Sequence, residues 1–145
     1  MAVSGKRVLS LAGCPPDPGT TKPMNYDRRQ RKPSFLALTG GLLAAVAVGL
    51  SAYASHGVAT AQAQSHVQMA ALFAFGHGLA LAALAPGTTR RLGTAALCLL
   101  LLGTLLFAGS LVGGALFGLP TRLAPTGGTM LMLGWVLWAV DAIRR

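Results

Sequence analysis

Acidic residues are scarce in this chain of 145 residues. It has no glutamate, and its three aspartates are Asp17, Asp27 and Asp141. Asp141 precedes Arg144 and Arg145 by three and four residues, so a pair on the surface of a helix would account for it. Carboxylate relays of pumps, paired-carboxylate catalysis and hard-cation sites all need acidic groups within the apolar segments. The sequence therefore argues against these three classes of function.

Cysteine is almost as rare, with only Cys14 and Cys98. Neither belongs to a CxxC motif or to a Cys/His cluster, so the sequence predicts no disulfide and no metal site. Cys14 ends a Leu-Ala-Gly-Cys stretch that matches a bacterial lipobox, but the apolar run before it is shorter than the roughly 7–15 residues of a signal sequence. Met24 is an alternative start, which would leave Cys14 outside the protein.

Charge of either sign is low for a water-soluble chain. Charged residues make up 10% and hydrophobic residues 53% of the sequence, whereas a soluble domain has about 25% charged residues. The net charge of +9 is concentrated, because seven of the twelve Lys and Arg residues precede residue 33 and the others lie at the ends of apolar runs. This distribution is typical of membrane orientation and not of nucleic-acid binding. We therefore expect a lipid bilayer, and no nucleic acid, as the environment.

The apolar segments predict an all-α membrane protein, a bundle of four transmembrane helices. Residues 1–33 are rich in Pro, Gly, Thr and basic residues, which favours a disordered basic cytoplasmic tail. Residues 34–145 form the transmembrane domain. Each span has about the length that a hydrocarbon core of roughly 30 Å requires, although the second is short and could begin within 61–68. The predicted spans are about 35–54, 69–85, 92–117 and 125–143.

The basic residues also predict the orientation. Eleven of them lie in the tail, between the second and third spans, or at the C-terminus, whereas Arg122 is the one basic residue in the connections on the other side. Because basic loops stay in the cytoplasm, we expect both termini to be cytoplasmic.

Small residues recur at a spacing of four, which lets membrane helices approach closely. We predict that these residues pack the helices and that the third helix is central; the alternative is that such pairs occur by chance in a chain rich in Ala and Gly. The residues predicted to pack helices are Gly41, Gly49, Gly109, Gly113, Gly114, Gly127 and Gly128.

Three polar residues are candidates for function: His56, His77 and Ser110. An intramembrane histidine can be a haem ligand, a metal ligand or a proton-linked switch, and His66 would share a helix face with His77. However, His56 and His77 are expected to differ in depth by about 10 Å, so we predict no cofactor and no metal. The structural alternative is a neutral histidine that forms a hydrogen bond to another helix. No base accompanies Ser110, and we predict no catalytic residue and no enzyme.

Four blocks of the sequence resemble domain-of-unknown-function family 423, typified by the YgdD-like small bacterial inner-membrane proteins. The blocks are Gly49 to Gly57, Gly76 to Leu81, Phe107 to Leu111, and Pro125 to Gly128 followed by Gly134-Trp135. The sequence departs from the family pattern at Ser51, Gly76, Ala108 and Ala124. The resemblance implies a four-helix protein of the bacterial inner (cytoplasmic) membrane and draws attention to His56 and His77. It implies no reaction.

Taken together, these features predict a non-enzymatic accessory or assembly protein with a membrane-protein partner or a homo-oligomeric state. The alternative is a small transporter or channel subunit that acts as an oligomer. A haem or metal redox protein is a more remote alternative.

Overall fold

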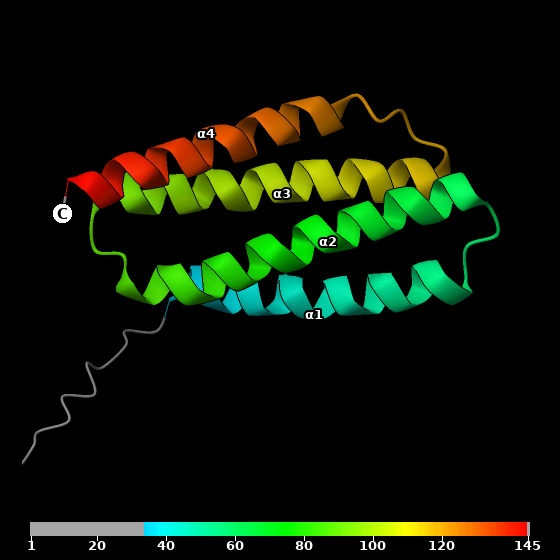
Figure 1. Ribbon diagram of the computed structural model, residues 1–145, viewed down its shortest axis with the longest axis horizontal. Coiled ribbons are helices and arrows are strands. Elements are labelled where there is room, and N and C mark those ends of the chain that lie inside the picture. Colours follow the sequence, from blue (N-terminus) through cyan, green and yellow to red (C-terminus); the bar gives the residue numbers. More distant parts are fainter. Residues whose placement is uncertain (1–33, 145) are drawn as a thin grey trace, which may run out of the picture. The chain divides into compact units, whose positions relative to one another are not determined.

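The computed structural model describes residues 34–144, and within this range every regular element is helical. The helices are α1 (Phe35–His56), α2 (Ala61–Leu84), the short 3-10 helix η1 (Ala85–Gly87), α3 (Arg91–Phe117) and α4 (Leu123–Ile143) (Figure 1). The predicted all-α class is thereby confirmed. The predicted tail and the lipobox cysteine lie outside the described residues.

Local sequence explains where the helices begin and end. The side-chain oxygens of Ser34 and Thr60 accept hydrogen bonds from backbone N–H groups three residues ahead, which caps the starts of α1 and α2. Because of the Thr60 cap, α2 begins at Ala61, eight residues before the predicted span. At the end of α3, Gly118 adopts a left-handed conformation with φ of 65°, which a residue with a side chain rarely adopts.

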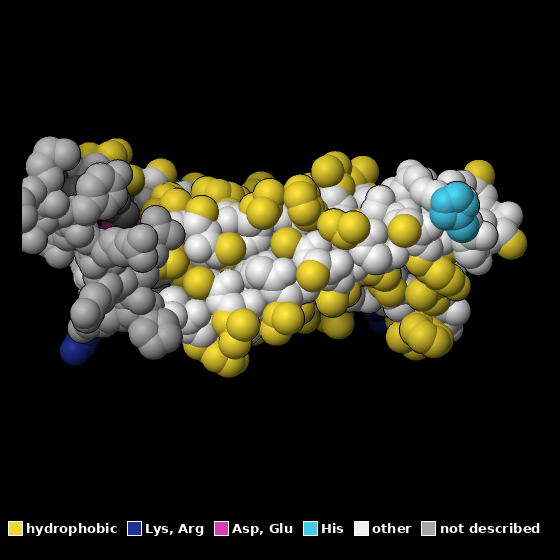
Figure 2. Space-filling model, turned by 90° about the horizontal axis from the view of Figure 1, so that it is seen from below, with side chains coloured by type: hydrophobic (Ala, Val, Ile, Leu, Met, Phe, Trp, Pro, Cys, Tyr) yellow, Lys and Arg dark blue, Asp and Glu magenta, His cyan; other side chains and the backbone are white. Residues whose placement is uncertain are grey.

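All four helices are long and apolar enough to cross a membrane, as expected of a multi-pass membrane protein. Hydrophobic side chains extend along the face seen in Figure 2, which agrees with a surface that contacts lipid. We name the two ends of the bundle by their charged residues. The arginine end holds the start of α1, the α2–α3 connection and the end of α4, with Arg90, Arg91 and Arg144; the histidine end holds the other two connections, with His56 and Arg122.

The helices pack as two hairpins that meet through α2 and α3. In the first hairpin, a Cβ added at Gly40 would lie 2.6 Å from the carbonyl oxygen of Gly78, and one at Gly78 would lie 2.7 Å from that of Gly40. In the second hairpin, the same reciprocal contact joins Gly103 and Gly127, at 3.0 and 2.8 Å. Each hairpin is therefore closed by a direct backbone contact that only glycine allows.

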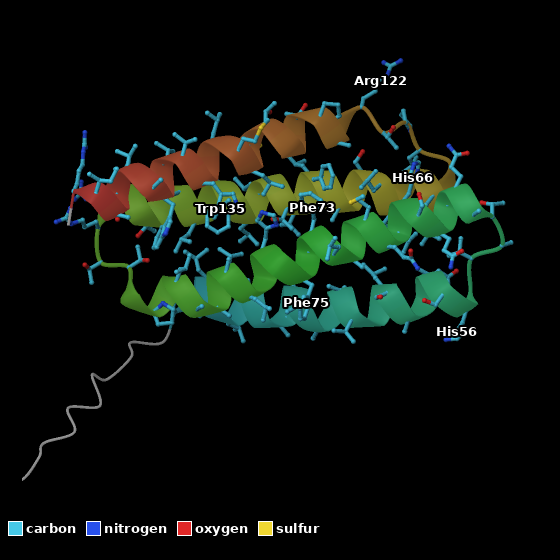
Figure 3. The ribbon with its side chains drawn as sticks, viewed as in Figure 1. His56, His66, Phe73, Phe75, Arg122 and Trp135 are labelled. Atoms are coloured by element: carbon cyan, nitrogen blue, oxygen red, sulfur yellow. The ribbon has the colours of Figure 1, made fainter. Side chains whose placement is uncertain are left out.

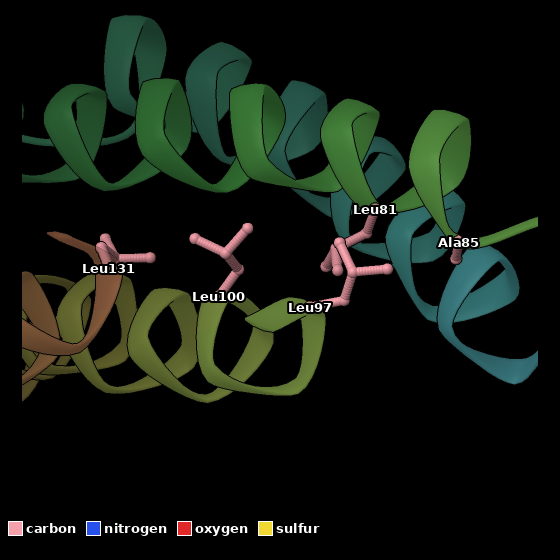
Figure 4. Packing of buried hydrophobic residues seen from close by; sticks show 5 residues of the cluster. All are labelled: Leu81, Ala85, Leu97, Leu100 and Leu131. Carbon is pink, nitrogen blue, oxygen red and sulfur yellow. The ribbon is translucent and has the colours of Figure 1, made fainter. Parts of the chain in front are cut away.

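Leucine side chains fill the space between the two hairpins. The buried cluster consists of Leu81, Ala85, Leu97, Leu100 and Leu131, contributed by α2, η1, α3 and α4 (Figure 4). A second cluster of small residues, with Ala47, Ala70, Ala74 and Ala108, lies between α1, α2 and α3. The predicted central position of α3 is thus shared with α2, because each of them lies between two neighbouring helices (Figure 1).

Candidate functional site

His77, near the middle of α2, is held by hydrogen bonds at both ring nitrogens. Its Nδ1 lies 2.7 Å from the carbonyl oxygen of Phe73, and its Nε2 lies 3.2 Å from Nε1 of Trp135 on α4. A carbonyl can only accept and an indole N–H can only donate, so the proton is on Nδ1 and Nε2 is unprotonated. His77 thus makes the interhelical hydrogen bond that the structural alternative expects. A metal ion or haem at Nε2 would have to displace Trp135.

The rings around His77 line an open groove over α3, between α2 and α4. Phe73 stacks on His77 with ring centroids 5.8 Å apart, and its centroid lies 4.7 Å from that of Phe107 on α3. Figure 3 labels Phe73 and Trp135. We call this feature the aromatic groove. It has a volume of about 680 Å³, is almost wholly apolar, and is lined by Phe73, His77, Phe107, Ala124, Pro125, Gly128, Thr129, Leu131, Met132 and Trp135.

The structure does not bring the candidate histidines together. His56 is the last residue of α1 and is exposed at the histidine end, with its side chain directed away from the bundle (Figure 3). His77 lies sixteen residues beyond the start of α2, which is about 24 Å along the helix axis. His66 is on the same helix as His77, nearer the histidine end. Within residues 34–144, no three His, Cys, Asp or Glu side chains gather closely enough to hold a metal ion.

Ser110, the third polar candidate, is on α3. Its hydroxyl oxygen is buried and has no hydrogen-bond partner among the described residues. Thr104, six residues earlier, bonds back to the carbonyl oxygen of Leu100 at 2.7 Å, as Ser and Thr commonly do in membrane helices. No base lies against Ser110 in the described contacts, and any functional role for it stays a prediction.

Several glycines predicted to pack helices within the bundle face outward instead. A Cβ added at Gly41, Gly49 or Gly109 would meet no atom within 4 Å. The expectation of packing inside the bundle is wrong for these three, because other small residues, such as Gly40 and Ala47 on α1 and Ala108 on α3, occupy the inner faces of these helices. Whether they pack against another chain stays a prediction.

The other predicted packing glycines have different surroundings. Gly127 is in the tight α3–α4 contact, whereas a Cβ at adjacent Gly128 would meet only the Phe107 ring, at 4.0 Å. Gly113 and Gly114 accommodate the α3–α4 connection, where a Cβ would approach Leu119 or Thr121. They make room for a returning loop and not for a helix.

Asp141 differs most from its expected position. It is 2% exposed in the last turn of α4, and its Oδ1 has no hydrogen-bond partner among the described residues. The prediction that Asp141 lies on the surface of the helix is therefore wrong. Arg145, one of its two expected partners, lies outside the described residues. Sequence spacing could have revealed this, because Asp141 follows Gly127 and Gly134 at intervals of seven, and all three are buried on one face of α4.

Comparison with known families identifies the chain. The family model described as "Protein of unknown function (DUF423)" matches residues 50–128, more than half of the sequence. The chain belongs to DUF423. No curated protein and no solved structure gives a match.

The DUF423 match runs from the end of α1 through α2 and α3 into the first turns of α4. It includes His56, His77 and Ser110, and it ends before Trp135 and Asp141. The predicted resemblance to this family is confirmed. Since the family carries no assigned activity, membership leaves the chemistry of the chain open.

Proposed function

We propose that this DUF423 protein is a non-enzymatic accessory protein that packs its α1 helix against a transmembrane helix of a partner or of a second copy. The observation that carries the proposal is an outward row on α1, formed by Gly41, Ala45 and Gly49. All three residues are exposed, and a Cβ added at either glycine would meet no atom of this chain.

The physical argument rests on how helices associate in lipid. Lipid tails are as apolar as leucine, so association depends on close packing, and small residues allow it. On its inner face, α1 already uses Gly40 and Ala44 in this way, because both are buried against α2. The outward row offers the same geometry on another side of α1, where the described chain supplies no helix to occupy it.

The proposal includes a location and an orientation. We place the protein in a bacterial inner membrane with the arginine end in the cytoplasm, together with both termini. Support comes from the family resemblance and from the eleven basic residues on that side against Arg122 on the other.

The test is a pair of bulky substitutions in the outward row, Gly41→Leu with Gly49→Leu. The tagged full chain is extracted gently at native expression, and the mass of the particle and its co-purifying proteins are recorded. We expect the variant to lose the partner or second copy and to keep its helical content, since both positions are open.

Gly76→Leu is the matched control, because Gly76 is also open but lies on α2 outside the row. It should leave the particle unchanged. A double variant with the mass and companions of the wild type would exclude α1 as the association surface.

One observation favours the second candidate, a small transporter or channel subunit acting as an oligomer. Ser51, Ser55 and Gln68 give a polar side to another groove, of about 600 Å³, between α1 and α2. Pores are lined by such polar groups. The test is solute flux into proteoliposomes that contain the protein. Flux that is lost in the Gln68→Leu variant would support a transporter. Absent flux, or flux that the variant leaves unchanged, would not.

A further inference from the structure

The arginine end contains a buried carboxylate, that of Asp141, which the proposed function does not explain. Asp141 is the one acidic residue in 34–144, and it is 2% exposed with Oδ1 unpartnered among the described residues. A buried charged group is costly unless a donor or an opposite charge compensates it. Such a group therefore calls for a ligand.

Asp141 lines a small polar pocket between the end of α4 and the α2–α3 connection. The pocket has a volume of about 170 Å³, more than a single water molecule needs. Its walls are Gly87, Thr88, Thr89, Arg90 and Asp141.

Gly93, in the first turn of α3, packs directly against the side chains of Thr88 and Asp141. A Cβ there would lie 2.9 Å from Oδ2 of Asp141 and 2.8 Å from Cγ2 of Thr88. Both distances are shorter than real Cβ contacts, so any other residue at Gly93 would intrude on the carboxylate.

Arg90 supplies the opposite charge at the rim of the pocket. One of its terminal nitrogens donates to the carbonyl oxygen of Arg144, at 2.6 Å, which holds the guanidinium beside the end of α4. A guanidinium has five N–H donors, so the others remain for an anion. The pocket therefore presents one buried anion and one exposed cation.

This charge pattern selects the ligand. A divalent cation prefers several anionic oxygens, and here a single carboxylate lies next to a guanidinium. A zwitterion with a primary ammonium and a phosphate matches both groups: the ammonium donates to Asp141, and the phosphate accepts from Arg90. The pocket also lies at the end of the apolar spans, among Arg90, Arg91 and Arg144, at the depth where lipid headgroups lie.

We propose that the Asp141–Arg90 pocket binds the phosphoethanolamine headgroup of a phospholipid from the surrounding leaflet. The ammonium occupies the pocket beside the Asp141 carboxylate, and the phosphate remains at the rim. A choline headgroup lacks N–H donors and carries three methyl groups, whereas a glycerol headgroup has no cation. The site therefore discriminates against both.

The test is lipid retention by the full-length protein. The detergent-solubilised protein is offered equal amounts of dioleoyl phosphatidylethanolamine, phosphatidylcholine and phosphatidylglycerol, and native mass spectrometry counts the bound lipids. We expect the ethanolamine lipid to be retained about tenfold over the choline lipid, in line with a charge-assisted hydrogen bond to a buried carboxylate.

Three variants separate the parts of the site. Asp141→Asn keeps the side-chain shape and should reduce the ethanolamine lipid to the level of the choline lipid, and Gly93→Ala should do the same by displacing the Asp141 carboxylate. Arg90→Gln should weaken retention of all three lipids, because each has a phosphate. Arg122→Gln, at the histidine end, is the control and should change nothing.

Equal retention of the three lipids by the wild type would overturn the proposal. Selectivity that survives in Asp141→Asn would overturn it as well. Loss of the partner in the α1 test has no bearing on this result, because the two surfaces are on different parts of the bundle.

Discussion

Adding a single methyl group at Gly127 should destabilise the tight α3–α4 contact, whereas the same change at a neighbouring position should not. A Cβ there would lie 2.5 Å from the backbone nitrogen of Phe107 and 2.8 Å from the carbonyl oxygen of Gly103. These are backbone atoms, which cannot rotate away. An ordinary Cβ contact begins at 3.4 Å, so Gly127→Ala must separate the two helices locally by about 1 Å.

The magnitude follows from two opposing terms. Overpacking of this kind costs about 1–3 kcal/mol, and the better helix propensity of alanine returns at most about 1 kcal/mol. We expect a net loss of up to about 2 kcal/mol for Gly127→Ala. At adjacent Gly128 the nearest atom would be 4.0 Å away, so Gly128→Ala carries the propensity term alone and should be neutral or slightly stabilising.

The assay is reversible unfolding in mixed micelles, titrated with a denaturing detergent and followed by circular dichroism. Gly40→Ala and Gly41→Ala provide a second pair on α1. The Cβ added at Gly40 would lie 2.6 Å from its nearest neighbour, whereas the Cβ added at Gly41 would have no neighbour within 4 Å. If Gly127→Ala and Gly128→Ala had the same unfolding midpoint, the close approach of α3 and α4 would be refuted.

Three further results are expected. Trp135→Phe removes the N–H that donates to His77 and should lower the free energy of unfolding by about 0.6 kcal/mol, and by at most about 1.7 kcal/mol. A double-mutant cycle with His77→Leu measures this coupling. Additive losses in the two single variants would contradict the hydrogen bond. Ser110→Ala should change stability by less than about 0.5 kcal/mol in the same unfolding assay, since its buried oxygen has no partner to lose, and a loss above about 1 kcal/mol would reveal one. In a cysteine-free background, Ala59→Cys and Thr89→Cys should react with an impermeant thiol reagent from opposite sides of the membrane, the second from the cytoplasm; labelling of both from one side would contradict the orientation.

The sequence was sufficient for the number and the class of the helices, because a long uncharged apolar run seldom forms anything except a membrane span. It was less informative about their ends. Residues 61–68 are polar, and the predicted second span includes them only as a possible start, yet they are helical from the Thr60 cap onward. Hydropathy measures what lies in lipid, whereas capping decides where the helix begins.

The faces of the helices could not be predicted from composition. In a soluble helix, polar residues mark the outside, but lipid and protein interior are equally apolar here. Adjacent Gly40 and Gly41 therefore look alike in sequence, although one touches α2 and the other faces outward. A spacing of seven marked an inner face at Gly127, Gly134 and Asp141, as it did at Gly40, Ala47 and Ala54, and it was the signal that would have placed Asp141 inside.

The reciprocal glycine contacts have a consequence for how the protein is made. Each hairpin joins helices that are consecutive in the chain, so the first can close before α3 has been synthesised. Around Leu81, Leu97 and Leu100, the interface between α2 and α3 is made by side chains instead of touching backbones. A substitution among these side chains would therefore shift one hairpin against the other without breaking the backbone contacts within either. Because the aromatic groove draws its walls from both hairpins, such a shift would change its width.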